Sequence, residues 1–441
     1  MPAFPKGFRT RTVTFTTAFA SSRARSSASM STFVTKVKQV TGALPVPEDA
    51  KSKAHHVLGR HGERLRFLNP WPSAGPQLVP WYRTLAMAFH TYLRYGLPSL
   101  EDARIPVAPP AFSPARTTEP VTAPLRATWL GHACYHVEFP GGLRVLFDPV
   151  FEQRCMPTQW IGPRRCSPPG AAVADLPFVD AVVISHSHFD HLSDPTVREL
   201  HRRHPAAHFF VGLGLARWFR ELGVPDAQVS EMDWWEDAEL TVSATAGEQD
   251  DGASAAAPPP PPPPPPPITA QISCLPSQHA SGRSAWDKDV TLWASWSVRS
   301  GGKAVWFAGD TGYRAVPRTE PAAAGERAED YYGAAYADLP RCPAFAHIGA
   351  LRGPFDLGLI PIGAYQPRHV WSNVHVDPLD AVELFGDTRC RRAMGVHWGT
   401  WALTSEDVDE PPAKLREALK RKGLPEEGLF DVCAVGETRE F

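Results

Sequence analysis

Side chains that bind metals are concentrated in one short stretch of the chain, residues 184–192. It contains His186, His188, Asp190 and His191 within six positions. Imidazole nitrogens and carboxylate oxygens are ligands of zinc and iron. The His-x-His pair follows a short apolar run and points both rings at one metal, whereas Asp190 and His191 face a second. Because burying so many unpaired titratable groups for a purely structural purpose would be costly, the stretch predicts a two-metal centre.

Three further candidate ligands lie downstream, each after a strand-like run. They are His279, Asp310 and His397. Gly309 allows a sharp turn that exposes the Asp310 carboxylate. Each residue alone would be an ordinary surface or core residue, but their order after the cluster favours one shared site.

A centre of this kind supports hydrolysis. Two zinc ions about 3.5–4 Å apart would hold a bridging water and lower its pKa to about 7, which supplies hydroxide for attack on phosphorus or a carbonyl carbon. The seven cysteines are odd in number and never spaced Cys-x-x-Cys. They indicate reduced thiols rather than a disulfide scaffold or a thiolate zinc site.

Short strands and helices must position these side chains. Interleaved strands and helices indicate a mixed α/β domain. The apolar and β-branched runs predict strands at 125–130, 135–139, 144–147, 181–185, 305–308 and 357–361. The helical patterns are at 195–204, 213–222, 378–385 and 412–422.

The order of these motifs resembles the metallo-β-lactamase superfamily and, more narrowly, the family of N-acyl-phosphatidylethanolamine-hydrolysing phospholipase D. The resemblance covers about residues 60–441. It implies an α/β (α+β) fold, the αββα sandwich, with an N-terminal extension. The blocks that carry it are Thr128–Ala133, Leu146–Val150, Gly309–Tyr313, Gly353–Leu357, Pro361–Tyr365, His375–Pro378 and His397–Thr400.

The resemblance also implies a distribution of ligands over two Zn²⁺ ions, with Asp310 as the bridge between them. One ion would take His186, His188 and His279, and the other would take Asp190, His191 and His397.

Two more residues match the family's active site. His375 matches a catalytic histidine, and Asp148 would orient a ligand histidine from behind. Two structural alternatives stay open: His375 could cap the helix that starts near Pro378, and Asp148 could serve the turn before Pro149.

The function implied by the resemblance is a zinc-dependent phospholipase D. A metal-bridging hydroxide would attack phosphorus in N-acyl-phosphatidylethanolamine and release N-acylethanolamine and phosphatidic acid. One alternative is another hydrolase of the same fold that acts on a lactone, a thioester or a phosphodiester. The other is a non-catalytic lipid-binding scaffold, although the complete ligand set argues against it.

The chain divides into three parts on composition. Residues 1–47 contain seven Lys and Arg but no Asp or Glu, which is typical of a mitochondrial transit peptide or of a disordered basic tail. Residues 48–125 form an N-terminal extension that could face a membrane. Residues 126–441 form the catalytic domain.

Two insertions interrupt the catalytic domain. One is the polyproline segment 247–267, which is either an inert surface loop or a ligand of a proline-binding module. The other is 314–341, which begins close to Asp310 and is either a lid or an exterior loop.

Charge and aromatic residues restrict the partners. The net charge of −2 argues against nucleic acid. We expect a phospholipid substrate and peripheral attachment to a membrane surface through Trp81-Tyr82, Trp234-Trp235 and the amphipathic segment 81–95, although such aromatic residues are often core. The expected location is mitochondrial and membrane-associated, with the cytosolic face of intracellular membranes as the alternative. A homodimer is compatible with the sequence.

Overall fold

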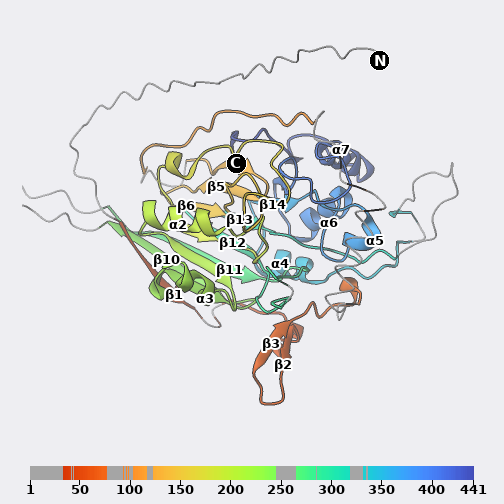
Figure 1. Ribbon diagram of the computed structural model, residues 1–441, viewed down its shortest axis with the longest axis horizontal. Coiled ribbons are helices and arrows are strands. Elements are labelled where there is room, and N and C mark those ends of the chain that lie inside the picture. The colour runs from red at the N-terminus through yellow and green to blue at the C-terminus, as the bar shows by residue number, and fades with distance from the viewer. Residues whose placement is uncertain are drawn as a thin grey trace, which may run out of the picture.

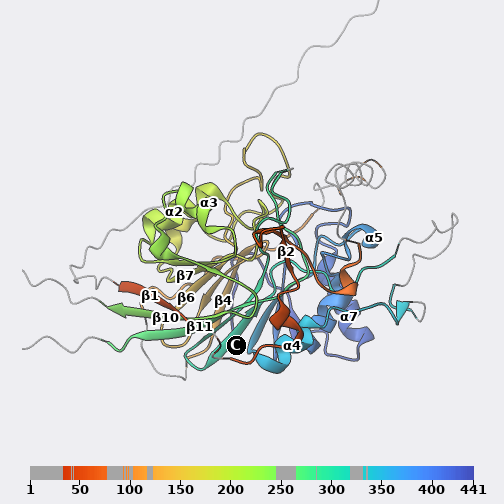
Figure 2. The same cartoon turned by 90° about the horizontal axis from the view of Figure 1, so that it is seen from below.

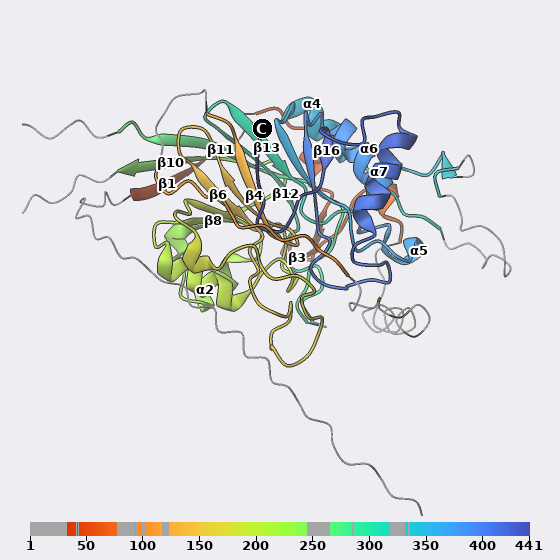
Figure 3. The same ribbon diagram turned by 90° about the horizontal axis from the view of Figure 1, so that it is seen from above.

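The computed structural model describes residues 33–40, 42, 44–76, 93, 96, 98, 103–116, 123–244, 265–284, 286–317, 331–333 and 336–441. Within them, two large sheets pack face to face and helices cover their outer faces (Figure 1). This is the predicted αββα sandwich. Figure 3 shows the sheets between α2 on one side and α4, α6 and α7 on the other.

The larger sheet has eight strands in the order β1-β10-β11-β12-β13-β14-β15-β16. It is antiparallel from β1 to β13 and parallel from β13 to β16. Its strands are β1 Phe33–Gln39, β10 Asp237–Ala244, β11 Ile268–Leu275, β12 Ser295–Ser300, β13 Lys303–Phe307, β14 Leu357–Pro361, β15 Ala393–Val396 and β16 Phe430–Asp431.

The second sheet has seven strands in the order β17-β4-β5-β6-β7-β8-β9. A separate two-stranded hairpin, β2 His56–Leu58 with β3 Arg64–Phe67, projects from the body (Figure 1). The strands of the seven-stranded sheet are β4 Arg126–Gly131, β5 Cys134–Glu138, β6 Arg144–Phe147, β7 Ala181–Val183, β8 His208–Gly212, β9 Val229–Met232 and β17 Thr438–Glu440.

Six α-helices lie in the described part of the chain, and two of them start at side-chain caps. Ser193 Oγ accepts the backbone N–H of Thr196 at the start of α2, and the Asp377 carboxylate accepts that of Asp380 at the start of α6. Such caps satisfy helix N–H groups that have no partner within the helix. The helices are α2 Asp194–Arg203, α3 Ala216–Glu221, α4 Ala344–Leu351, α5 Arg368–Trp371, α6 Pro378–Asp387 and α7 Pro411–Arg421.

Side chains of the seven-stranded sheet alternate between two buried clusters, as the pleat of a strand requires. Phe147 and Val183 face the larger sheet, whereas their neighbours Leu146 and Val182 face α2 and α3. Since both faces are covered, residues 145–147 of β6 and all of β7 are apolar. Their carboxyl ends therefore emerge together at one edge, where residues 184–192 begin. We call these residues the ligand loop.

The first strand falls within the segment 1–47 that composition assigned to a transit peptide or a disordered tail. Residues Phe33–Gln39 pair with β10 along their whole length. The ordered domain therefore begins before residue 48. Composition hid this strand because the segment is basic and because this edge strand exposes Val34, Lys36 and Lys38 on one face.

Several predicted segments lie outside the described residues. They are Trp81-Tyr82, most of the predicted helix 81–95, most of the polyproline segment 247–267 and the middle of the insertion 314–341. The first insertion joins β10 to β11, which are antiparallel neighbours.

The expectation that Trp234-Trp235 faces a membrane is wrong. Both side chains are buried. Trp234 stacks between Trp71 and His55, with ring centroids 5.4 and 4.2 Å away. These aromatic residues join the N-terminal extension to the core. All seven cysteines are free thiols, as predicted.

Candidate metal centre

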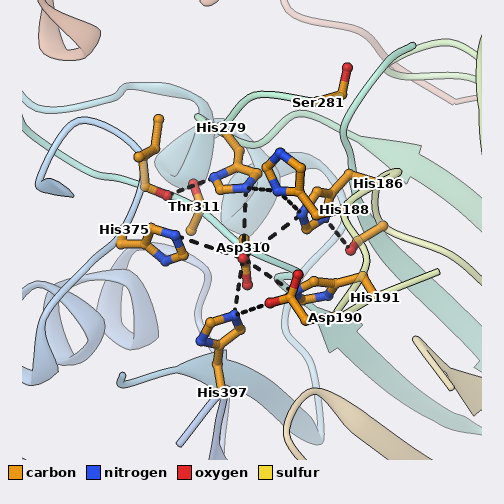
Figure 4. A network of polar contacts seen from close by, with 12 residues as sticks. His186, His188, Asp190, His191, His279, Ser281, Asp310, Thr311, His375 and His397 are labelled. Carbon is orange, nitrogen blue, oxygen red and sulfur yellow. Dashed lines mark hydrogen bonds and ion pairs between the residues drawn. The ribbon is translucent and has the colours of Figure 1, made fainter. Parts of the chain in front are cut away.

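The first group of ligands comes from the loop after β7 and from the loop after β11. His186 Nε2 lies 2.8 Å from His188 Nδ1, which lies 3.3 Å from His279 Nε2. These three nitrogens converge on one point (Figure 4). Three histidine nitrogens at such spacing fit one metal ion, with a coordination position left for water or substrate.

The second group is formed by Asp190, His191 and His397. Asp190 Oδ2 lies 3.4 Å from His191 Nε2 and 3.4 Å from His397 Nε2. Both nitrogens are buried and have no hydrogen-bond partner. A buried nitrogen without a partner is costly, so this donor set fits a second metal ion.

Asp310 lies between the two groups. Its Oδ2 is 3.2 Å from His191 Nε2 and 3.1 Å from His397 Nε2 in the second group. The same oxygen is 3.6 Å from His279 Nε2 in the first. One carboxylate therefore reaches both groups, which is the position of a bridging ligand.

Gly309 makes this position of Asp310 accessible. It has φ +57°, and a Cβ added there would lie 2.5 Å from the Cβ of Ser185. Only glycine permits both the left-handed backbone and the close approach of the two loops.

Asp148 supports the ligand loop from behind. Its Oδ2 is 2.6 Å from His191 Nδ1, and its Oδ1 accepts the backbone N–H of Ser185 at 2.7 Å. The Ser185 hydroxyl also donates to the carboxylate. The bond to Nδ1 leaves His191 Nε2 to face the metal position, as in carboxylate–histidine–metal triads.

His375 lies beside the ligand set, between α5 and α6. Its ring centroid is 5.1 Å from that of His279 and 5.3 Å from that of His397. The alternative that His375 caps the following helix is wrong, because Asp377 caps α6. His375 therefore faces the site, with its Nε2 3.9 Å from Asp310 Oδ2.

Burial and charge set the protonation of these groups. Burial lowers the pKa of His375 to about 4 against the attraction of Asp310, and it lowers the pKa of His186 and His279 well below the usual range. These imidazoles are therefore neutral at neutral pH, and neutral imidazole is the form that binds metal.

The two carboxylates are held ionised. Burial would raise the pKa of Asp190 and Asp310, but the positive field of His191 and its neighbours outweighs burial and lowers both values well below the usual range. In turn, Asp310 and Asp190 overcome burial and raise the pKa of His397 to about 9. In the absence of metal, protons therefore supply part of the positive charge that the carboxylates attract.

Sequence reasoning assigned no role to His132. Its Nε2 lies 3.0 Å from Asp190 Oδ2, and its carbonyl accepts the backbone N–H of His397 at 3.0 Å. His132 belongs to the block Thr128–Ala133, which is the part of the sequence that could have indicated its role. His132 orients one ligand through its ring and another through its backbone.

Asn69 was also missed, because it lies in the N-terminal extension. Its side chain forms two hydrogen bonds with the backbone of His279, a donated one of 2.8 Å and an accepted one of 3.1 Å. On the other side, the His279 ring lies 2.9 Å from the carbonyl oxygen of Val374 through Nδ1. No local pattern in the sequence connects residues so far apart.

Comparisons with known proteins agree with this geometry. A family model described as a beta-lactamase superfamily domain matches residues 143–330 and 322–398. An N-acyl-phosphatidylethanolamine-hydrolyzing phospholipase D of Caenorhabditis elegans is 32% identical over 320 residues, which are 72% of this chain and 76% of the nematode protein.

Two further relatives extend the comparison. A mitochondrial N-acyl-phosphatidylethanolamine-hydrolyzing phospholipase D of Saccharomyces cerevisiae is 28% identical over 84% of this chain and 65% of the yeast protein. An uncharacterized protein of Mycobacterium tuberculosis is 33% identical over 67% of this chain. The chain spans just under two thirds of the yeast and mycobacterial proteins. The chain thus belongs to the metallo-β-lactamase superfamily and, within it, to the family of N-acyl-phosphatidylethanolamine-hydrolysing phospholipase D.

Proposed function

We propose that the protein is a metal-dependent phospholipase D that hydrolyses N-acyl-phosphatidylethanolamine to N-acylethanolamine and phosphatidic acid. The observation that carries this proposal is the complete, converging set of ligand atoms, whose two carboxylates, Asp190 and Asp310, have only histidines as ion-pair partners among the described residues. Family membership supports the choice of substrate.

The seven residues would hold two Zn²⁺ ions as two groups of three that share Asp310. The ions, when bound, would activate water and stabilise negative charge on the phosphate. Asp148 and His132 hold the imidazole of His191 and the carboxylate of Asp190 in position. Asn69 fixes the loop that contributes His279.

His375 would contact the substrate itself. Its ring is neutral and borders both ligand groups, and its Nδ1 has no hydrogen-bond partner. A neutral imidazole has one N–H, which it can donate to a phosphate oxygen, and one free lone pair. We therefore assign His375 to orienting the phosphate and to stabilising the charge that develops on it.

The proposed partner is a membrane surface, because the proposed substrate resides in a bilayer. A mitochondrial location is supported by the name of the yeast relative and by the composition of residues 1–32, which contain five Lys and Arg but no Asp or Glu. In the part of the chain that the structure describes, no helix is both long and apolar enough to cross a bilayer. The homodimer stays a prediction.

The test is an assay of the full chain with N-acyl-phosphatidylethanolamine in H₂¹⁸O, read by mass spectrometry, with Asp190→Ala as the control variant. We expect phosphatidic acid that carries the label, and none from the variant. Labelled free fatty acid would show attack at an acyl carbonyl and would contradict the proposal. No turnover by a metal-loaded protein would favour a different substrate for the same centre.

A further inference from the structure

Two tryptophans project into solvent from the tips of two loops. Trp160 is 89% exposed in the loop 151–166, where Ile161 beside it is 64% exposed. Trp286 is 85% exposed in the loop 281–291. Exposed apolar side chains that lie together, as Trp160 and Ile161 do, mark surfaces that contact proteins or membranes.

The loop 151–166 is attached to the metal centre at its base. Arg154 and Arg164 form an antiparallel bridge that closes the loop. The carbonyl of Gln153 accepts the indole N–H of Trp401 at 3.3 Å, and the Trp401 ring lies 4.8 Å from that of His132. Trp401 thus connects the base of the loop to His132, which orients Asp190.

The loop 281–291 binds the ligand loop directly. Arg283 Nη1 donates to the carbonyls of Ser187 and Leu192 at 3.0 and 2.6 Å, and its guanidinium lies 4.1 Å from the ring centroid of Phe189. The backbone N–H of Gly282 donates to Ser187 Oγ at 3.0 Å. The position of Trp286 is therefore fixed relative to the ligands.

Both loops adjoin the side of the centre that is open to solvent. Among the metal-ligand residues, His188 and Asp190 are partly exposed, whereas the other five are buried. Figures 2 and 3 show the yellow loop 151–166 and the green loop 281–291 projecting from the same side of the molecule. The two loops that carry the exposed tryptophans thus lie on the same side of the molecule.

The charge of this surface fits an anionic lipid. Residues 153–164 contain Arg154 and Arg164 but no Asp or Glu, and the two basic residues of 281–291 are balanced by two acidic ones. N-acylation removes the ammonium charge of phosphatidylethanolamine and leaves its phosphate, so the proposed substrate is a net anion. A basic and aromatic surface binds the headgroup region of an anionic bilayer.

We propose that Trp160, Ile161 and Trp286 form a docking surface that inserts into the headgroup layer of an anionic phospholipid bilayer. Tryptophan suits this layer because its ring is apolar and its N–H is polar. Docking in this orientation brings the turn 188–190 onto the lipid surface. This inference rests on the proposed function for its substrate, but its binding test does not require turnover.

The experiment is flotation of the full chain with vesicles of phosphatidylcholine, with and without phosphatidic acid. The test variant combines Trp160→Ser with Trp286→Ser. The matched control combines Leu58→Ser with Leu65→Ser, two exposed apolar residues of the β2–β3 hairpin. We expect the test variant to lose about tenfold or more in partitioning to anionic vesicles, because both substitutions remove apolar surface that the bilayer would bury. The control should float like the parent protein.

Activity provides the second measurement. The test variant should lose turnover of vesicle substrate in proportion to binding but keep the parent rate on a short-chain, dispersed analogue. Unchanged flotation of the test variant, or equal loss in the control, would overturn the docking surface. If the test variant floats like the parent but sediments with a different mass, the two loop tips contact another copy of the chain. This result would also overturn the docking surface. If the test variant no longer floats, but neither it nor the parent protein releases phosphatidic acid, the docking surface stands and the proposed function is overturned.

Discussion

In the residues that the structure describes, histidine and aspartate side chains gather at the candidate metal centre and at a second cluster, and the two differ in their charge. The second cluster is formed by His55, His56 and Asp233. His55 Nε2 lies 2.7 Å from Asp233 Oδ1, and His56 Nε2 lies 3.1 Å from Asp233 Oδ2. By distance alone, both clusters fit a metal ion.

Charge separates them. Lys53 Nζ is 2.8 Å from Asp233 Oδ2, so a fixed ammonium already neutralises this carboxylate. In the described residues, the ion-pair partners of Asp190 and Asp310 are all histidines. A buried nitrogen without a partner does not distinguish the clusters, because His56 Nε2 is one too. Asp190 and Asp310 therefore keep a negative charge that a metal ion would neutralise, whereas Lys53 already neutralises Asp233.

The largest expected effect comes from removing the shared carboxylate. Asp310→Ala should lower bound metal below the parent amount and decrease kcat by about a thousandfold or more, because charge stabilisation in the transition state is lost. Metal analysis of the dialysed protein and the ¹⁸O assay measure both effects. Parent activity in this variant would remove Asp310 from the centre.

Removal of the carboxylate charge in the second cluster, by Asp233→Asn, should affect stability instead. Asp233→Asn leaves Lys53 and two histidines without their buried counter-charge, and we expect a loss of about 2–3 kcal/mol in the free energy of unfolding. Urea unfolding measures it. Bound metal should stay at the parent amount, so a loss of metal would mean that the clusters are equivalent.

The effect of Asp233 should also depend on pH. Burial raises the pKa of Asp233, but His55 and Lys53 outweigh it and lower that pKa well below its usual range. Its stabilisation is therefore complete above the unfolded pKa of about 4 and is lost as the pH falls through the lower folded value. The difference in unfolding free energy between parent and variant should be smaller at about pH 3 than at pH 7. An equal difference at both values would contradict this assignment.

A smaller effect on metal binding is expected from Asp148, which positions the ligand His191. Asp148→Asn keeps the volume of the side chain but weakens its bond to His191, so metal affinity should decrease by about 10- to 100-fold. Competition with a chelator measures the affinity. Because Asp148 does not touch the metal positions, the variant saturated with metal should recover most of its activity. An unrecovered loss would place Asp148 in the reaction itself.

The smallest effect concerns the second insertion. Tyr332 donates a hydrogen bond to Asp377, and Arg314 lies 4.3 Å from the Tyr332 ring centroid while pairing with Asp380 at 2.9 Å. These contacts anchor the insertion to α6. Tyr332→Phe should cost about 1 kcal/mol of stability with little change in kcat. A large loss of kcat would support the alternative of a lid.

The sequence predicted those parts of the fold that local patterns encode. The apolar runs located β6, β7 and β14 because these strands are buried on both faces, and the helical periods located α2 and α6 because each helix buries one face. The residues of the metal centre could be named because their side chains follow strand ends that meet at one edge. The structure brings all seven together.

Other features depended on contacts between distant segments. Asn69 of the N-terminal extension binds the backbone of His279, and β1 lies in a basic segment whose pairing with β10 no local pattern indicates. Trp234 was misplaced at a membrane because aromatic content does not tell a core from an interface. Such features follow from tertiary packing, which composition does not record.

The most direct test of the central claim is an anomalous-difference map at the zinc edge from crystals of the full chain. We predict two peaks about 3.5–4 Å apart, one among His186, His188 and His279 and the other among Asp190, His191 and His397, with Asp310 between them. We predict no peak at His55, His56 and Asp233. A peak at that second cluster, or a metal centre that holds one ion, would contradict the account.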